Sequence, residues 1–180
     1  MTDLMKLPAF NDEDLINLVV ESPRGSTVKL KYDPDHRVIT LSRPLVLGLC
    51  YPYDWGFVPS TRGPDGDPVD AFVMWEGTTY PGVLIACRPI GVLYVEQTNP
   101  ESGVRERNDR LALLPASAPR MDGLRSVLDF HERVRTELER FFVDAVAFEG
   151  KELKILGWGG PGDATALVRG SRIHRQHAHA

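Results

Sequence analysis

The chain has 180 residues, of which 42% are hydrophobic and 26% are charged, as in an ordinary globular protein with one core. Its net charge of −4 argues against a broadly basic surface that binds nucleic acid. No apolar run approaches the roughly 20 residues of a membrane span, and the N-terminus lacks a signal-peptide pattern. We therefore expect a cytoplasmic protein without nucleic-acid or membrane partners. Cys50 and Cys87 are expected to be free thiols, with a single disulfide as the alternative.

Short strands are predicted for the first two thirds of the chain. Residues 27–32 and 37–41 flank Asp33-Pro34-Asp35-His36, and turn formers between two strand-like runs indicate a hairpin. Further strand-like runs cover residues 69–75, 83–95 and 111–114. The polar segment between the last two runs is rich in loop-forming residues.

Helical periodicity marks the C-terminal third. The apolar positions with helical spacing are Val127, His131, Val134, Leu138, Phe141, Phe142 and Ala145. With charges on the opposite face, they predict one amphipathic helix of roughly five turns, in which His131 is a packing or interface residue rather than a ligand. A last strand is expected over residues 151–156, and Gly160-Pro161 predicts a short helix over about residues 162–170.

The order of these elements, strands first and helices late, predicts an α+β fold with a small antiparallel barrel or curled sheet. We expect a single domain over residues 1–170. A polar tail, residues 171–180, follows and contains His174, His177 and His179.

Three carboxylates lie within the segment Asp65-Gly66-Asp67-Pro68-Val69-Asp70. Because like charges this close repel one another, a cation is expected to neutralise them, and carboxylate oxygens suit Mg²⁺, Mn²⁺ or Ca²⁺. A solvated acidic turn is the simpler alternative. A Ca²⁺-binding helix-loop-helix is rejected, because Val69 stands at a ligand position and Asp70 at the position that requires glycine.

A phosphoryl-transfer site is a third interpretation, and it requires acids for metal ions and cations for phosphate oxygens. The segment before the acidic cluster supplies candidates: Glu21, Lys29, Lys31, Arg43 and Asp54. Such residues carry little weight by themselves, because most surface Lys and Arg are simply solvated.

The acidic segment resembles the signature of family I soluble inorganic pyrophosphatases, and its surroundings extend the resemblance over about residues 15–160. The supporting segments are Val19-Val20-Glu21-Ser22-Pro23, Val28-Lys29, Ser42-Arg43-Pro44, Tyr51-Pro52-Tyr53-Asp54-Trp55-Gly56-Phe57, Pro81-Gly82, Cys87-Arg88-Pro89-Ile90-Gly91-Val92-Leu93, Phe141-Phe142 and Gly157-Trp158. The resemblance implies a five-stranded antiparallel, OB-like barrel flanked by the long C-terminal helix and the short helix. It also implies hydrolysis of pyrophosphate to two phosphates by a metal-activated water, with Mg²⁺ as cofactor and Mn²⁺ as a substitute.

Roles follow from the resemblance position by position. Asp65 and Asp70 would ligate the activating metals, and Glu21 would help to hold a substrate-bound metal. Asp67 would assist deprotonation of the water. The residues implied to bind phosphate oxygens are Lys29, Arg43 and Arg110. Family members are commonly homo-oligomers, so a homo-oligomer is expected.

Several positions depart from the family pattern. Lys31 replaces a metal-site glutamate, Trp55 replaces a tyrosine, and Gln97 and Asn108 replace aspartates. A one-residue shift would place Asp109 at the second aspartate position, and Glu96 or Glu106 could also compensate. The tyrosine-lysine pair after the long helix maps near Ala145-Val146. Three hypotheses stay open: a pyrophosphatase, a related phosphohydrolase with another phosphate substrate, and a non-catalytic phosphate- or metal-binding protein.

Overall fold

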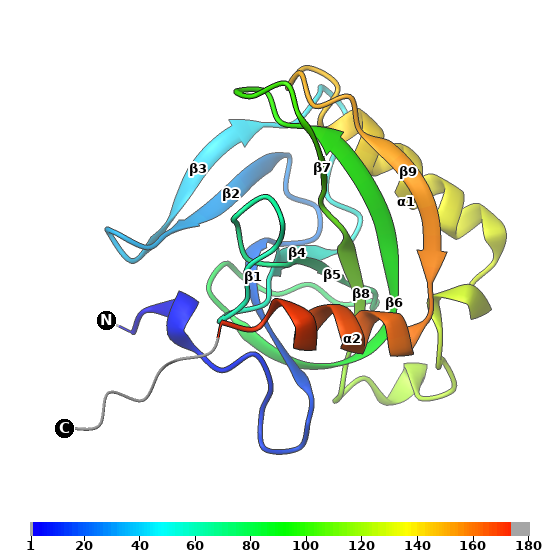
Figure 1. Ribbon diagram of the computed structural model, residues 1–180. Coiled ribbons are helices and arrows are strands. Elements are labelled where there is room, and N and C mark those ends of the chain that lie inside the picture. The colour runs from blue at the N-terminus through cyan, green and yellow to red at the C-terminus, as the bar shows by residue number, and fades with distance from the viewer. Residues whose placement is uncertain (1, 174–180) are drawn as a thin grey trace.

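The computed structural model describes residues 2–173. Its strands are β1 (Ile16–Ser22), β2 (Val28–Asp33), β3 (Val38–Pro44), β4 (Asp54–Phe57), β5 (Asp70–Val73), β6 (Leu84–Thr98), β7 (Arg105–Arg107), β8 (Arg110–Pro115) and β9 (Lys154–Gly159). Its helices are α1 (Glu132–Ala145) and α2 (Pro161–Ser171), with 3-10 turns η1 (Leu4–Lys6), η2 (Pro119–Met121) and η3 (Val127–Asp129). The mixed α+β class is confirmed (Figure 1).

The main sheet has seven strands and is organised around the long strand β6. The pairings run from β1 through β4, β5, β8 and β6, and β6 pairs with β1 again. β7 and β9 attach to the far half of β6. The expectation of a wholly antiparallel sheet is wrong at one pair, because β5 and β8 are parallel. β8 runs antiparallel to β6 but lies beside β5, whose direction it shares.

The hairpin of β2 and β3 forms a separate two-stranded sheet, and Figure 1 shows it projecting beyond the main sheet. Its turn is built by Asp33, whose Oδ1 accepts hydrogen bonds from the backbone N–H groups of Asp35 and His36. Arg37 completes the turn with a φ of 56°. Because side chains alternate along a strand, Lys29 and Lys31 of β2 lie on the same face of this hairpin.

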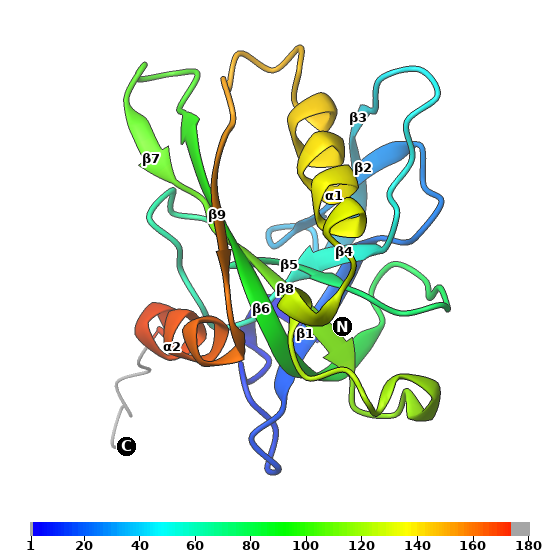
Figure 2. The ribbon, with the colours of Figure 1, turned by 90° about the vertical axis from the view of Figure 1, so that its right-hand side faces the viewer.

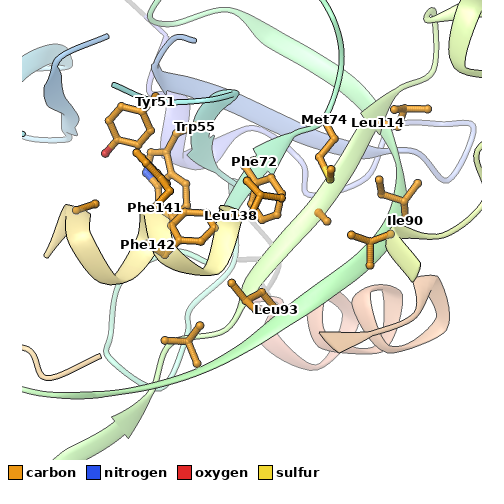
Figure 3. Packing of buried hydrophobic residues seen from close by; sticks show 14 of the residues in the cluster. Tyr51, Trp55, Phe72, Met74, Ile90, Leu93, Leu114, Leu138, Phe141 and Phe142 are labelled. Carbon is orange, nitrogen blue, oxygen red and sulfur yellow. The ribbon is translucent and has the colours of Figure 1, made fainter. Parts of the chain in front are cut away.

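Helix α1 lies along the upper part of the sheet in Figure 2 and supplies aromatic side chains to one hydrophobic cluster. Figure 3 shows Phe141 and Phe142 of α1 pointing toward Trp55 and Phe72. The ring centroids of Phe142 lie 5.5 Å from Trp55 and 5.4 Å from Phe72. Each such buried ring contributes roughly 1.5–3 kcal/mol, so α1 is fixed by its aromatic face.

Helix α1 starts later than the sequence pattern predicts. Ser126 and Asp129 form a capping box that closes the separate turn η3, so the helical run is interrupted before Glu132. The prediction that His131 packs in the apolar stripe is wrong, because His131 is the N-cap and its side chain accepts a hydrogen bond from the N–H of Arg133.

Helix α2 packs Ala164 and Val168 into a second hydrophobic cluster, together with residues of β1, β5, β6 and β8. It ends at Ser171, which the sequence analysis assigned to the tail. The predicted tail histidines His174, His177 and His179 lie outside the described residues. Within residues 2–173, every helix is too short or too polar to cross a membrane.

Candidate active site

A cavity of about 220 Å³ lies where β2, the loop between β4 and β5, the far end of β6 and the C-terminal end of α1 meet. Every site position singled out by the resemblance lines it: Glu21, Lys29, Lys31, Arg43, Trp55, Asp65, Asp67, Asp70, Gln97, Asn108, Arg110, Ala145 and Val146. These residues come from distant parts of the sequence. The fold therefore brings the predicted set together in one place.

The acidic loop is tightly turned. Gly66 has a φ of 86°, a conformation that favours glycine, and the N–H of Asp67 donates to Oδ1 of Asp65 over 3.2 Å. Burial, and then the charge of Asp70, raises the pKa of Asp65 to about 6. Burial also raises the pKa of Asp70, although Lys29 and Arg110 oppose the shift. Both carboxylates are thus unfavourably placed as anions until a cation approaches.

Two of the predicted acids already have partners. Glu21 is 6% exposed, and its Oε1 accepts a hydrogen bond of 2.7 Å from the N–H of Tyr32. Burial raises the pKa of Glu21 to about 7. The Nζ of Lys31 lies 2.8 Å from Oδ2 of Asp67, and this contact raises the pKa of Lys31 although burial opposes it. Lys31 therefore places an ammonium group within the acidic segment.

The predicted phosphate-binding cations differ in their present contacts. Arg43 donates to the carbonyl oxygen of Ala145 over 2.7 Å and pairs with Glu149 at 3.2 Å, so it caps the C-terminal end of α1. Arg110 is buried, and its guanidinium lies 4.4 Å from the ring centroid of Phe142. Burial lowers the pKa of Arg110 to about 10, and burial likewise lowers the pKa of Lys29.

Three buried polar atoms have no hydrogen-bond partner among the described residues, and all three belong to residues that line the cavity. They are Nε1 of Trp55, Oε1 of Gln97 and Nε of Arg110. These residues are 4%, 3% and 5% exposed, respectively. An unpaired buried polar group costs about 1–3 kcal/mol, so its presence at a cavity indicates that a ligand or water supplies the missing partner. Two donors and one acceptor are available.

The structure settles the register of the loop before β8. Asn108 lines the cavity, whereas Asp109 accepts a hydrogen bond of 2.9 Å from the N–H of Val95 and pairs with Arg107 at 2.8 Å. In this arrangement Asn108 faces the cavity, and Asp109 is paired outside its lining.

The two other candidate replacements are also outside the cavity lining. Glu96 pairs with Arg105 at 2.8 Å, and Glu106 accepts a hydrogen bond from Asn99. Glu106 is nevertheless close enough for its charge to contribute to the raised pKa of Asp65, after burial and the charge of Asp70.

Lys151 also lines the cavity, although no sequence motif pointed to it. Its loop is shaped by Gly150 and Glu152, with φ values of 66° and 42°, and is held to β6 because the N–H of Thr98 donates to the carbonyl of Lys151. The positive charge of Lys151 adds to the effect of burial in lowering the pKa of Lys29 and opposes the rise in the pKa of Asp70 that burial causes, so it acts on the centre of the cavity. The only sequence signal was a lysine after a turn glycine.

The carboxylates fit part of the metal site that the resemblance implies. Within residues 2–173, no group of three or more His, Cys, Asp or Glu side chains is arranged to hold a metal ion. The carboxylate of Asp67 is paired with the ammonium group of Lys31, and the carboxylate of Glu21 accepts a hydrogen bond from the backbone N–H of Tyr32. Asp65 and Asp70 remain, and the unpaired Oε1 of Gln97 is a further oxygen at the cavity. This oxygen-only donor set suits a hard divalent cation such as Mg²⁺.

Carboxylates for a hard cation, together with Lys and Arg for an anion, define the class of site that transfers phosphoryl groups. The profile of the family described as "Inorganic pyrophosphatase" matches residues 18–176. The chain belongs to the inorganic pyrophosphatase family.

Inorganic pyrophosphatases from other organisms are similar to this chain over most of its length. The chain is 36% identical over 156 residues to an inorganic pyrophosphatase from Synechocystis sp., covering 87% of this chain and 89% of that protein. It is 37% identical over 158 residues to one from Streptomyces coelicolor, covering 86% and 92%. The crystal structure of inorganic pyrophosphatase from Thermus thermophilus superposes with a TM-score of 0.86 at 33% identity, covering 94% of this chain and 97% of that one.

Proposed function

We propose that the protein is an inorganic diphosphatase that hydrolyses pyrophosphate to two phosphates with Mg²⁺, or with Mn²⁺ as a substitute. The observation that carries this proposal is that Asp65, Asp67 and Asp70 line the same cavity as Lys29 and Arg110, in a chain of the pyrophosphatase family. The acids attract the cation and the bases attract the anion, so the two can meet in one place.

The proposed roles follow from the contacts. Lys29 and Arg110 bind phosphate oxygens, and Arg43 joins them by exchanging its contact with Ala145 for the substrate. Asp65 and Asp70 would hold the divalent cation, with Glu21 as a further ligand. When bound, Mg²⁺ would lower the pKa of an attacking water. Asp67 would act as the general base that accepts a proton from the attacking water.

The same proposal extends to the surroundings of the site. We propose a single domain over residues 1–170 in a cytoplasmic protein, and a homo-oligomer as the family resemblance implies. The finer architecture that we propose is a five-stranded OB-like barrel, supported by the circuit of pairings from β1 through β4, β5, β8 and β6.

Phosphate release from pyrophosphate, measured with Mg²⁺ and with Mn²⁺, tests this function. We expect Asp67→Asn to lower the rate by about 10²–10⁴-fold, the range of a lost general base. Asp12→Asn is the matched control, because Asp12 is an exposed aspartate outside the cavity lining. No metal-dependent release by the folded wild-type protein, or equal rates for both variants, would refute the proposal.

A second candidate is a phosphohydrolase for another phosphate compound. It is favoured by the apolar side chains that Ala145 and Val146 present to the cavity, where the resemblance implies a tyrosine and a lysine. A panel of phosphate monoesters, nucleoside triphosphates and tripolyphosphate, assayed with the same metals, separates the two functions. A rate above that for pyrophosphate would favour the second candidate, and activity on pyrophosphate alone would remove it.

A further inference from the structure

The formal charge of the cavity has the opposite sign to that of the whole chain. Its acidic side chains are Glu21, Asp65, Asp67 and Asp70. Its basic side chains are Lys29, Lys31, Arg43, Arg110 and Lys151. The bases exceed the acids by one, whereas the chain carries −4 overall. The protein therefore gathers a positive excess at one cavity without any metal ion.

Lys31 is the cation most directly involved in this balance. Its Nζ lies 2.8 Å from Oδ2 of Asp67, and it also interacts electrostatically with Glu21 and Asp70. A tethered ammonium group among three carboxylates neutralises part of the charge that would otherwise require a divalent cation. Both Lys31 and Asp67 keep about half of their side-chain surface exposed, so this ammonium group stays accessible to an incoming anion.

Two buried donors give independent evidence of the ligand's chemistry. Trp55 and Arg110 line the cavity, and the Nε1–H of Trp55 and the Nε–H of Arg110 have no acceptor among residues 2–173. The guanidinium of Arg110 lies 5.5 Å from the ring centroid of Trp55, so the two donors belong to neighbouring side chains. Neighbouring unpaired donors suit an anion that offers several oxygen acceptors, as a phosphate group does.

We propose that the cavity binds pyrophosphate and phosphate anions before, and independently of, a divalent cation, with Lys31 supplying part of the positive charge that a metal ion would otherwise provide. The inference rests on the proposed function for the chemical class of the ligand. It adds an order of events, in which the anion binds the lysines and arginines first. Asp65 and Asp70 are the residues that would then hold the metal ion.

The test is calorimetric titration of the protein with methylenediphosphonate, a non-hydrolysable pyrophosphate analogue, in excess EDTA. We expect the wild-type protein to bind it, and Lys31→Glu to weaken binding at least about tenfold, because the charge of the cavity then changes sign. Trp55→Phe, which keeps a ring but removes the donor, is expected to weaken binding by roughly 3- to 10-fold.

Lys154→Glu is the matched control. It makes the same change in net charge at an exposed position of β9 that does not line the cavity, so its binding should match that of the wild type within about twofold. Circular dichroism verifies that each variant is folded, and Lys31→Met replaces Lys31→Glu if the latter is not. No binding in EDTA, equal binding by all variants, or equal loss in Lys31→Glu and Lys154→Glu would overturn the inference.

A second readout concerns the metal itself. Binding of Mn²⁺ without any anion, followed by electron paramagnetic resonance, should be tighter in Lys31→Glu than in the wild type, because an ammonium group is replaced by a carboxylate. Weaker or equal Mn²⁺ binding would contradict the role of Lys31. Phosphate release with Mg²⁺ separates this inference from the proposed function. Release of phosphate without binding of the analogue in EDTA would refute the inference alone. Binding of the analogue in EDTA without release of phosphate would refute the proposed function alone.

Discussion

The cavity has two walls that differ in what they do for stability. The aromatic wall consists of Tyr51, Trp55, Phe141 and Phe142. Its rings contact one another at centroid distances of 5.2–6.1 Å, and their burial stabilises the fold. The charged wall consists of Glu21, Lys29, Lys31, Asp65, Asp67, Asp70 and Lys151.

Burial raises the pKa of Glu21, Asp65 and Asp70 and lowers that of Lys29, which means that it disfavours their charged forms. The charged wall therefore lowers the stability of the fold when no ligand is bound. Local rules of stability are expected to fail where a protein binds or reacts. The difference between the walls therefore locates the chemistry on the charged wall and the scaffold on the aromatic wall. Arg110 joins the two, since it lies over Phe142 and interacts with Asp70.

Removing a ring from the aromatic wall should have the largest effect on stability. Phe142→Ala deletes contacts with Trp55, Phe72 and Arg110, and we expect the free energy of unfolding to fall by about 3–5 kcal/mol. Urea unfolding followed by tryptophan fluorescence measures this change. Phe148→Ala is the control, because Phe148 is 86% exposed, and its effect should stay within about 0.5 kcal/mol. Similar losses for both variants would contradict the assignment of the scaffold to this wall.

In the charged wall, neutralising a buried acid should instead increase the free energy of unfolding. Because the pKa of Glu21 is about 7 in the folded protein and near 4.5 ordinarily, the folded state keeps a proton that the unfolded state has released between these pH values. Stability therefore falls as pH rises from about 4.5 to 7. Glu21→Gln keeps an acceptor for the N–H of Tyr32 and removes this loss, which we expect to be roughly 1–3 kcal/mol.

The measurement for Glu21 is urea unfolding of both proteins between pH 4.5 and pH 7.5 without metal ions. The gap in unfolding free energy should widen in favour of the variant as pH rises. Glu13→Gln, at an exposed position outside the cavity, should leave the pH dependence unchanged. A constant gap across this range would show that Glu21 titrates at its ordinary pKa.

The smallest expected effect belongs to Lys151. Lys151→Met should raise KM for pyrophosphate about tenfold, change kcat less than twofold and leave unfolding unaltered, because Lys151 brings to the cavity a positive charge that we expect to bind the anion rather than to react. Lys151→Arg should restore most of the affinity, and Lys154→Met should have no effect. An equal fall in kcat and kcat/KM would instead show that Lys151 makes an interaction with the substrate only in the transition state.

The sequence was informative about the charged wall because its chemistry is concentrated in short motifs. The segment Asp65–Asp70 supplies three acidic cavity residues in order, and Lys29, Arg43 and Arg110 were located by their neighbouring residues. The α+β class followed from strands early and helices late. These features depend on local residue types, which a sequence displays directly.

Other features depend on pairings that a single sequence does not display. Asn108 rather than Asp109 lines the cavity, because the carboxylate of Asp109 accepts a hydrogen bond from the N–H of Val95 on another strand. The parallel pair of β5 and β8 arises from the path of β6. Lys151 is brought to the cavity by a loop that hydrogen-bonds to β6. In contrast, the late start of α1 was visible locally, since Ser126 and Asp129 have the spacing of a capping box.

The position of β6 has a consequence for synthesis of the chain. This strand pairs with β1, which precedes it, but also with β7, β8 and β9, and the last of these ends at Gly159. When β6 has just emerged from the ribosome during synthesis, its edges that pair with β7, β8 and β9 are still unpaired. They stay exposed until most of the remaining chain has been made. Such edges invite association between chains, so newly made protein should depend on chaperones far more than the finished fold does.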